Sequence, residues 1–152
     1  MDKHYIPNTK GVIFANKNKF SFSIDSILLS YFSKVKKDKI LIDIGAGTGI
    51  IGFRINFLNN LKTVYLIEIQ NENTELIEHS IVENKLNNVV LLNKDLKECY
   101  NEFENSSVDY IVSNPPYKKM NTGILNKDEN FLISRYEYAL KLEDILDFSY
   151  KK

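Results

Sequence analysis

The chain has 152 residues, which is enough for one domain with a buried core. Apolar residues make up 43% and charged residues 26%, so neither a disordered nor a fibrous protein is indicated. The formal net charge is zero, and no apolar run approaches the roughly 18 residues of a membrane span, so we expect a cytoplasmic protein with no membrane partner.

The predicted elements begin with a helix over residues 24–35. Its apolar side chains recur at helical spacing, and this stripe predicts a helix that covers one edge of a cleft or packs on a sheet. The residues of the stripe are Ile24, Ile27, Leu28, Tyr31, Phe32 and Val35.

Further along, short apolar runs alternate with amphipathic segments, the pattern of βαβ units in a mostly parallel sheet. The predicted strands are residues 39–43, 63–68, 89–93 and 108–113. The predicted helices between and after them are residues 50–58, 73–86, 96–103 (the weakest pattern) and 142–150. Right-handed crossovers would place helices on both faces of the sheet. The lone cysteine, Cys99, has no Cys or His at metal-ligand spacing, so no metal site is predicted.

A glycine-rich turn follows the first of these strands. Residues 43–50 read Asp-Ile-Gly-Ala-Gly-Thr-Gly-Ile, in which glycines allow positive φ and close approach of a ligand. The helix that follows offers unpaired N–H groups at its start, so the turn fits a nucleotide cofactor.

Residues 47–52 also satisfy the dinucleotide-binding fingerprint, with Glu68 as a ribose ligand at the end of the second strand. The turn alone therefore leaves the cofactor open. Asp43 favours a cationic ligand, because a carboxylate suits the ammonium of a methionine moiety and repels a pyrophosphate.

The tetrapeptide Asn114-Pro115-Pro116-Tyr117 follows the fourth strand, where open α/β sheets bind ligands. Consecutive prolines fix φ and remove two donors, so the loop presents carbonyl groups. An amide oxygen and a proline carbonyl form a pair of acceptors for a planar NH2 group, whose lone pair attacks a methyl sulfonium in line. Tyr117 offers an aromatic face on which a planar target, such as a flipped base, stacks.

The turn resembles the signature loop of class I S-adenosylmethionine methyltransferases. The resemblance implies a Rossmann-like, mostly parallel α/β sheet and S-adenosyl-L-methionine as cofactor. It implies that Glu68 grips the ribose hydroxyls and that Asp95 accepts a hydrogen bond from adenine, although Asp95 also fits a helix cap. The cofactor residues predicted around the turn are Asp43, Gly45, Ala46, Gly47 and Gly49.

The tetrapeptide resembles the motif of enzymes that methylate adenine N6 or glutamine N5. Flanking segments narrow this choice, because residues 20–29, 135–137 and 142–146 are similar to segments of the bacterial tRNA1(Val) (adenine-37-N6)-methyltransferase family. That resemblance implies tRNA as substrate and Asp25 as a further cofactor contact. A protein glutamine N5-methyltransferase, or a cofactor-binding protein without turnover, remains the alternative.

Members of that family continue with further strands beyond the point where this chain stops. We therefore expect residues 1–38 to form an N-terminal segment with a helix on the cofactor cleft, and residues 39–152 to form a methyltransferase core of only four strands. The expected sheet would expose residues 108–113 as an apolar edge. A truncated chain that forms a homodimer, or that needs a complementing C-terminal segment, is the corresponding expectation.

Overall fold

A computed structural model describes residues 1–16, 22–115 and 140–152. Its centre is a parallel sheet of four strands in the order β5-β4-β3-β6. The strands are β3 (Ile40–Ile44), β4 (Thr63–Ile67), β5 (Val89–Leu92) and β6 (Tyr110–Ser113). All four predicted strands are confirmed to within two residues at each end, and the predicted α/β class with a mostly parallel sheet is confirmed as well.

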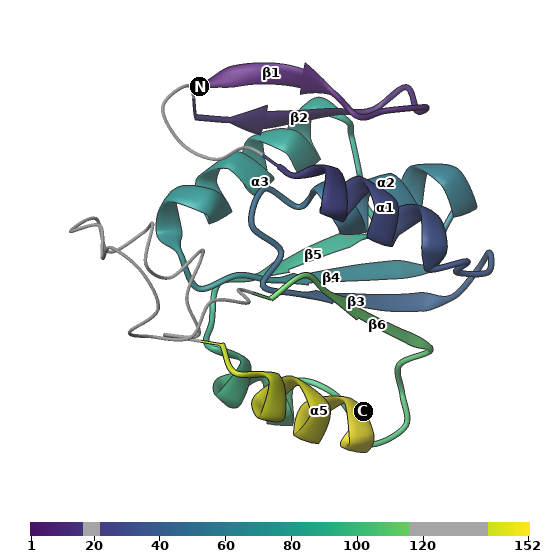
Figure 1. Ribbon diagram of the computed structural model, residues 1–152, viewed down its shortest axis with the longest axis vertical. Coiled ribbons are helices and arrows are strands. Elements are labelled where there is room, and N and C mark those ends of the chain that lie inside the picture. Colours follow the sequence, from purple (N-terminus) through teal and green to yellow (C-terminus); the bar gives the residue numbers. More distant parts are fainter. Residues whose placement is uncertain (17–21, 116–139) are drawn as a thin grey trace.

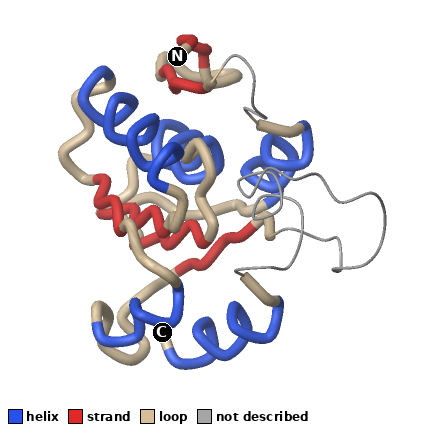
Figure 2. The backbone as a smooth tube through the Cα atoms, turned by 90° about the vertical axis from the view of Figure 1, so that its left-hand side faces the viewer, coloured by secondary structure: helices blue, strands red, loops and turns tan. Residues whose placement is uncertain are grey.

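Helices cover both faces of this sheet (Figure 1). On one face lie α1 (Ile24–Phe32), α2 (Ile50–Asn59) and α3 (Asn71–Glu83), and on the other lie the 3-10 helix η1 (Leu96–Asn101) and α5 (Leu142–Lys151). Figure 2 shows the same two layers of helix on either side of the strands. Each layer buries its own apolar cluster, with Phe53 and Leu66 in the first and Phe148 and Cys99 in the second. The weakest predicted helix has formed as a 3-10 helix.

A hairpin that the sequence did not predict lies at the start of the chain. It consists of β1 (Asp2–Tyr5) and β2 (Val12–Ala15), paired antiparallel. The outer edge of β2 is closed by α3, because Val12 N–H donates to Asn84 Oδ1 at 2.9 Å and Phe14 N–H donates to Ser80 Oγ at 3.0 Å. These partners lie more than 60 residues away along the chain, so the local pattern carries no sign of them.

The prediction that the apolar stripe of α1 packs on the protein is wrong for most of its residues. Ile24, Tyr31 and Phe32 are 74%, 69% and 68% exposed, and Leu28 is also exposed. The buried residues of α1 are Ser26 and Ser30, because their hydroxyl groups have polar partners in the interior. Val35 beyond the helix is buried, as the stripe predicted.

Among the described residues, β6 is an edge strand with β3 as its only sheet neighbour, as the expected strand order requires. None of the described helices combines the length and the apolar character that a membrane crossing demands. Because the four strands are parallel, their carboxyl ends lie along one edge of the sheet. Residues 45, 68, 93 and 114 follow these ends, so the predicted site residues converge there.

Candidate active site

The glycine loop connects β3 to α2 and is held by the neighbouring strand. Gly45 N–H and Ala46 N–H both donate to the carbonyl oxygen of Ile67, at 2.9 and 3.0 Å. Gly47 has φ of +59° and a Cβ built there would meet no atom within 4 Å, so the loop is open at this glycine. An open, left-handed glycine facing no side chain suits the close approach of a ligand to the backbone.

Glu68, which follows β4, is bonded to this loop. Its Oε2 accepts the Gly47 N–H at 2.7 Å and its Oε1 accepts the Gln70 N–H at 2.8 Å. Burial raises the pKa of Glu68, while the backbone N–H groups of Gln70 and Gly47 oppose that rise. The Ile69 N–H and the Asn73 side chain also bond this carboxyl group and lower its pKa. The carboxylate therefore couples the glycine loop to the end of β4 and to the start of α3.

Asp43 lies beneath the loop and is completely buried. Its Oδ2 accepts the Gly52 N–H at the start of α2 at 2.8 Å, and its Oδ1 has no hydrogen-bond partner. Burial raises the pKa of Asp43 to about 7, the Gly52 N–H lowers it and the charge of Glu68 raises it further. In their ionised form, two carboxyl groups next to the glycine loop disfavour a pyrophosphate and favour a cation.

The remaining predicted cofactor residues lie at the same edge but differ in what they contact. Gly49 begins α2 as its N-cap with φ of +78°. Asp95 is half-buried and caps η1, because its Oδ1 accepts the Lys97 N–H at 2.9 Å, so the alternative interpretation as a cap describes its observed contact. Asp25 is exposed in the first turn of α1.

Asn114 and Pro115 directly follow β6, while Pro116 and Tyr117 lie outside the described residues. Ser113 Oγ donates to the carbonyl oxygen of Ile44 at 2.8 Å, which ties the end of β6 to the strand that carries the glycine loop. Asn114 is half-buried, and its Nδ2 donates to Ser26 Oγ in α1 at 3.2 Å. Because β3 and β6 are neighbours in the sheet, the glycine loop and the start of the tetrapeptide lie next to each other at its carboxyl edge.

Sequence reasoning missed Ser26 and the buried residue Arg54. Arg54 in α2 is 3% exposed, and its Nη1 donates to Ser30 Oγ at 2.9 Å while its Nε donates to the Pro7 carbonyl at 3.1 Å. These bonds hold α1 and the hairpin region against α2. The available signal was a lone charged residue in a mostly apolar helix. Its partners cannot be deduced from local spacing, because they lie in distant segments of the chain.

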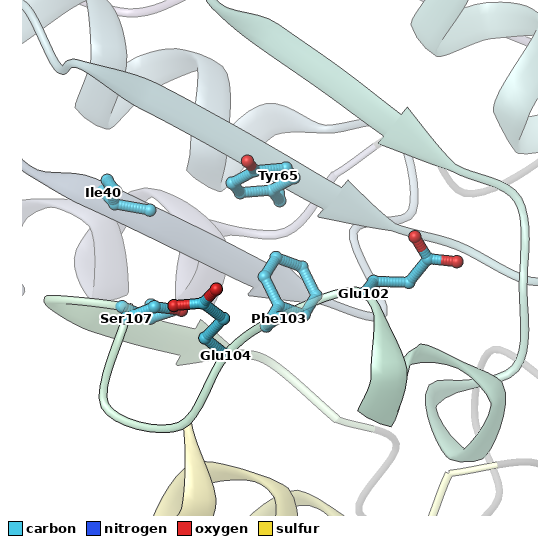
Figure 3. A pocket seen from close by; sticks show the side chains of 7 residues that line it. Ile40, Tyr65, Glu102, Phe103, Glu104 and Ser107 are labelled. Atoms are coloured by element: carbon cyan, nitrogen blue, oxygen red, sulfur yellow. The ribbon is translucent and has the colours of Figure 1, made fainter.

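A separate pocket lies on the face that carries η1, near the amino ends of β3 and β6 (Figure 3). The rings of Tyr65 and Phe103 meet edge to face there at 4.8 Å between centroids. Ile40, the first residue of β3, lines this pocket, so the pocket lies away from the carboxyl edge of the sheet. No predicted site residue lines it.

Solved structures of methyltransferases share this fold. Precorrin-6y C5,15-methyltransferase of Geobacter metallireducens aligns with a TM-score of 0.57 at 15% identity, over 66% of this chain and 52% of that chain. Trm5b of Pyrococcus abyssi aligns with a TM-score of 0.58 at 19% identity, over 76% of this chain and 33% of that chain. The parallel sheet with its glycine loop is therefore the Rossmann-like sheet of class I methyltransferases.

The methyltransferase small domain family matches residues 10–138, and the chain belongs to this family. A tRNA1(Val) (adenine(37)-N6)-methyltransferase of Parabacteroides distasonis is 26% identical over 153 residues, covering 99% of this chain and 62% of that protein. An uncharacterised RNA methyltransferase of Fusobacterium nucleatum is 33% identical over 105 residues, covering 66% of this chain. The chain spans only 22% of the latter relative's length.

The family and the fold imply S-adenosyl-L-methionine as the cofactor. The residues present fit this molecule, because the loop is open at Gly47 and the Glu68 carboxyl group, bonded to the Gly47 N–H, lies beside that opening. Gly52 also allows close packing of α2 on β4, since a Cβ there would lie 2.5 Å from Leu66 Cδ2. The same close packing occurs in dinucleotide-binding proteins, so the glycines alone do not distinguish the two cofactors. The choice of S-adenosyl-L-methionine therefore rests on the family.

Proposed function

We propose that this chain carries an adenine-N6 methyltransferase site that acts on RNA, with adenine 37 of tRNA1(Val) as its target. The observation that carries the proposal is the placement of Asn114 and Pro115 at the end of β6, beside the strand that bears the glycine loop. A methyl donor and an exocyclic amine bound at this edge would lie next to each other.

The orientation of the Asn114 side chain supports a role in holding an amine. Its Nδ2 is bonded to Ser26, and no donor among the described residues bonds its Oδ1. We propose that this oxygen accepts one hydrogen of the target amine and that the carbonyl of Pro115 accepts the second. Two acceptors that bind both hydrogens of an adenine N6 amino group would orient its lone pair away from them.

The cofactor supplies an electrophilic methyl group on a positively charged sulfur. With the cofactor bound, transfer would form an N–C bond from the nitrogen lone pair, break the S–C bond and leave the sulfur neutral. The N6 proton becomes acidic as that bond forms and passes to solvent, so Asn114 orients and polarises the amine without acting as a strong base. Tyr117 is proposed to stack on the target base.

In the cofactor half of the site we assign the glycine loop to the methionine moiety and Glu68 to the ribose. The loop residues proposed to contact the cofactor are Asp43, Gly45, Ala46, Gly47 and Gly49. Asp95 and Asp25 are proposed as further contacts, from η1 and α1. The proposed division of the chain is a helix-bearing segment over residues 1–38 and a cofactor-binding core over residues 39–152.

RNA is favoured as substrate by the names of the two relatives, one a tRNA adenine-N6 enzyme and the other an RNA methyltransferase. The test is transfer of a labelled methyl group from S-adenosylmethionine to unmodified tRNA or to a release-factor protein, run side by side. We expect label in tRNA only. Label in the protein alone would replace the proposal with glutamine methylation, and titration with NAD in place of S-adenosylmethionine should show no binding.

A further inference from the structure

The Asn114 amide has a single described anchor, and that anchor comes from the opposite end of the chain. Its Nδ2 donates to Ser26 Oγ at 3.2 Å across 88 residues of sequence. Ser26 is only 7% exposed, so this bond is largely shielded from water. We infer that Ser26 is a positioning residue that fixes which end of the Asn114 amide faces the target, an inference that rests on the function proposed above.

The orientation matters because the two ends of an amide are opposite in character. With Oδ1 toward the target, Asn114 accepts a hydrogen from the amino group that is to be methylated. With the amide flipped, its NH2 group would face another NH2 group, and no hydrogen bond would hold the target nitrogen. A group that binds Nδ2 selectively therefore favours the productive orientation.

A serine hydroxyl either donates or accepts, so its own surroundings decide what it offers to Asn114. Ser23, the N-cap of α1, lies with its Oγ 3.4 Å from Ser26 Oγ and also accepts the Ser26 N–H at 3.3 Å. When the Ser26 hydroxyl hydrogen points to Ser23, its lone pairs face Asn114. In that arrangement Ser26 accepts from Asn114, which matches the direction of the Nδ2 to Oγ bond.

Ser26 is itself held in place one turn further along α1. Ser30 Oγ accepts from the buried Arg54 guanidinium at 2.9 Å and donates to the Ile27 carbonyl at 2.7 Å. Arg54 belongs to α2, the helix that begins at the glycine loop. The hydrogen bonds therefore link the target-holding amide, through α1, to the helix next to the cofactor loop.

The test compares Ser26→Ala with Ser26→Thr, which keeps the hydroxyl, and with Ser33→Ala, which removes a hydroxyl near the far end of α1. Ser33 Oγ donates to the Leu29 carbonyl at 2.6 Å, so its loss is a matched change away from Asn114. We expect Ser26→Ala to lower kcat for methyl transfer to RNA about tenfold, the effect of one hydrogen bond, with KM and cofactor affinity unchanged. Ser26→Thr should recover most of that activity, and Ser33→Ala should keep it.

A second readout does not depend on turnover. In 15N-labelled protein the side-chain NH2 signals of Asn114, assigned by their loss in Asn114→Ala, should exchange slowly with water in the unmodified chain and in Ser26→Thr. In Ser26→Ala the exchange should become faster. Three results would each overturn the inference. They are unchanged exchange in Ser26→Ala, an unchanged kcat in Ser26→Ala, and a loss of kcat in Ser33→Ala as large as that in Ser26→Ala. Absence of any methyl transfer would overturn the proposed function, while the exchange measurement would still test the Ser26 contact.

Discussion

The two halves of the proposed site are held in different ways. The cofactor half is tied internally by several short bonds, in which Glu68 binds the glycine loop and Asp43 binds the start of α2. In the part of the target half that the structure describes, the contacts are one strand end and the side-chain bond from Asn114 to α1. Changes in the first half should therefore affect cofactor binding and stability, and changes in the second should affect transfer alone.

The largest effect is expected from Asn114→Ala, which removes the acceptor for the target amine. Methyl transfer should fall about a thousandfold, since one preorganised polar group contributes on this scale. Affinity for S-adenosylmethionine, measured by calorimetry, should stay within about twofold of the unmodified chain, because Asn114 bonds Ser26 of α1 while Glu68 bonds the glycine loop. Asn59→Ala, at the far end of α2, is the matched control. Loss of cofactor binding in Asn114→Ala would contradict the separation of the two halves.

Asp43→Asn should change how stability depends on pH. The folded-state pKa of Asp43 is about 7, above the ordinary 3.8, so the folded protein binds a proton that the unfolded chain lacks between these values. Its contribution to stability is therefore fully present below about pH 4 and is lost as the pH rises through 7. In the unmodified chain this group should lower the free energy of unfolding by about 3 kcal/mol between pH 5 and pH 8. Asp43→Asn should lack this decrease. Parallel pH profiles for both chains in urea unfolding would refute the burial argument.

Glu68→Ala should weaken binding of S-adenosylmethionine about thirtyfold, because Gly47 N–H and Gln70 N–H both lose their acceptor. Calorimetric titration measures this, with Glu83→Ala on the exposed end of α3 as control. An unchanged affinity would mean that the glycine loop keeps its shape without Glu68.

The smallest effects are expected at two glycines, Gly47 in the loop and Gly52 in the first turn of α2. Gly52→Ala should lower the free energy of unfolding by about 1–2 kcal/mol, because its Cβ would lie 2.5 Å from Leu66 Cδ2 in the core. Gly47→Ala meets no atom within 4 Å, so it should mainly weaken cofactor binding, with a smaller strain from its positive φ. Thermal unfolding and calorimetry on both variants separate the two effects. Weaker cofactor binding in Gly52→Ala together with lost stability in Gly47→Ala would contradict this assignment.

The sequence predicted the parts of the fold that depend on local pattern. The four strands follow from short, mostly apolar runs such as Ile40–Ile44, and the glycine loop follows from its spacing. The hairpin was missed because β2 is completed by Asn84 and Ser80 of α3. The apolar stripe of α1 was misplaced because hydrogen bonds from Arg54 and Asn114 turn its serines inward.

The candidate site shows the same limit. The spacing of the motifs placed the glycine loop, Glu68 and Asn114 at one sheet edge, and the topology confirms that edge. It did not predict that Asp43 would be buried with one oxygen unpartnered, since burial depends on how α2 packs over β3. Contacts that join distant segments, such as Asn114 with Ser26, require the folded chain.

The most direct test of the proposed chemistry is to identify the methylated product. The chain is incubated with S-adenosylmethionine and unmodified tRNA, and the tRNA is digested to nucleosides and analysed by mass spectrometry. We predict N6-methyladenosine from the unmodified chain and none from Asn114→Ala. A methyl group on any other atom, or bound cofactor with no methylated nucleoside, would contradict the account.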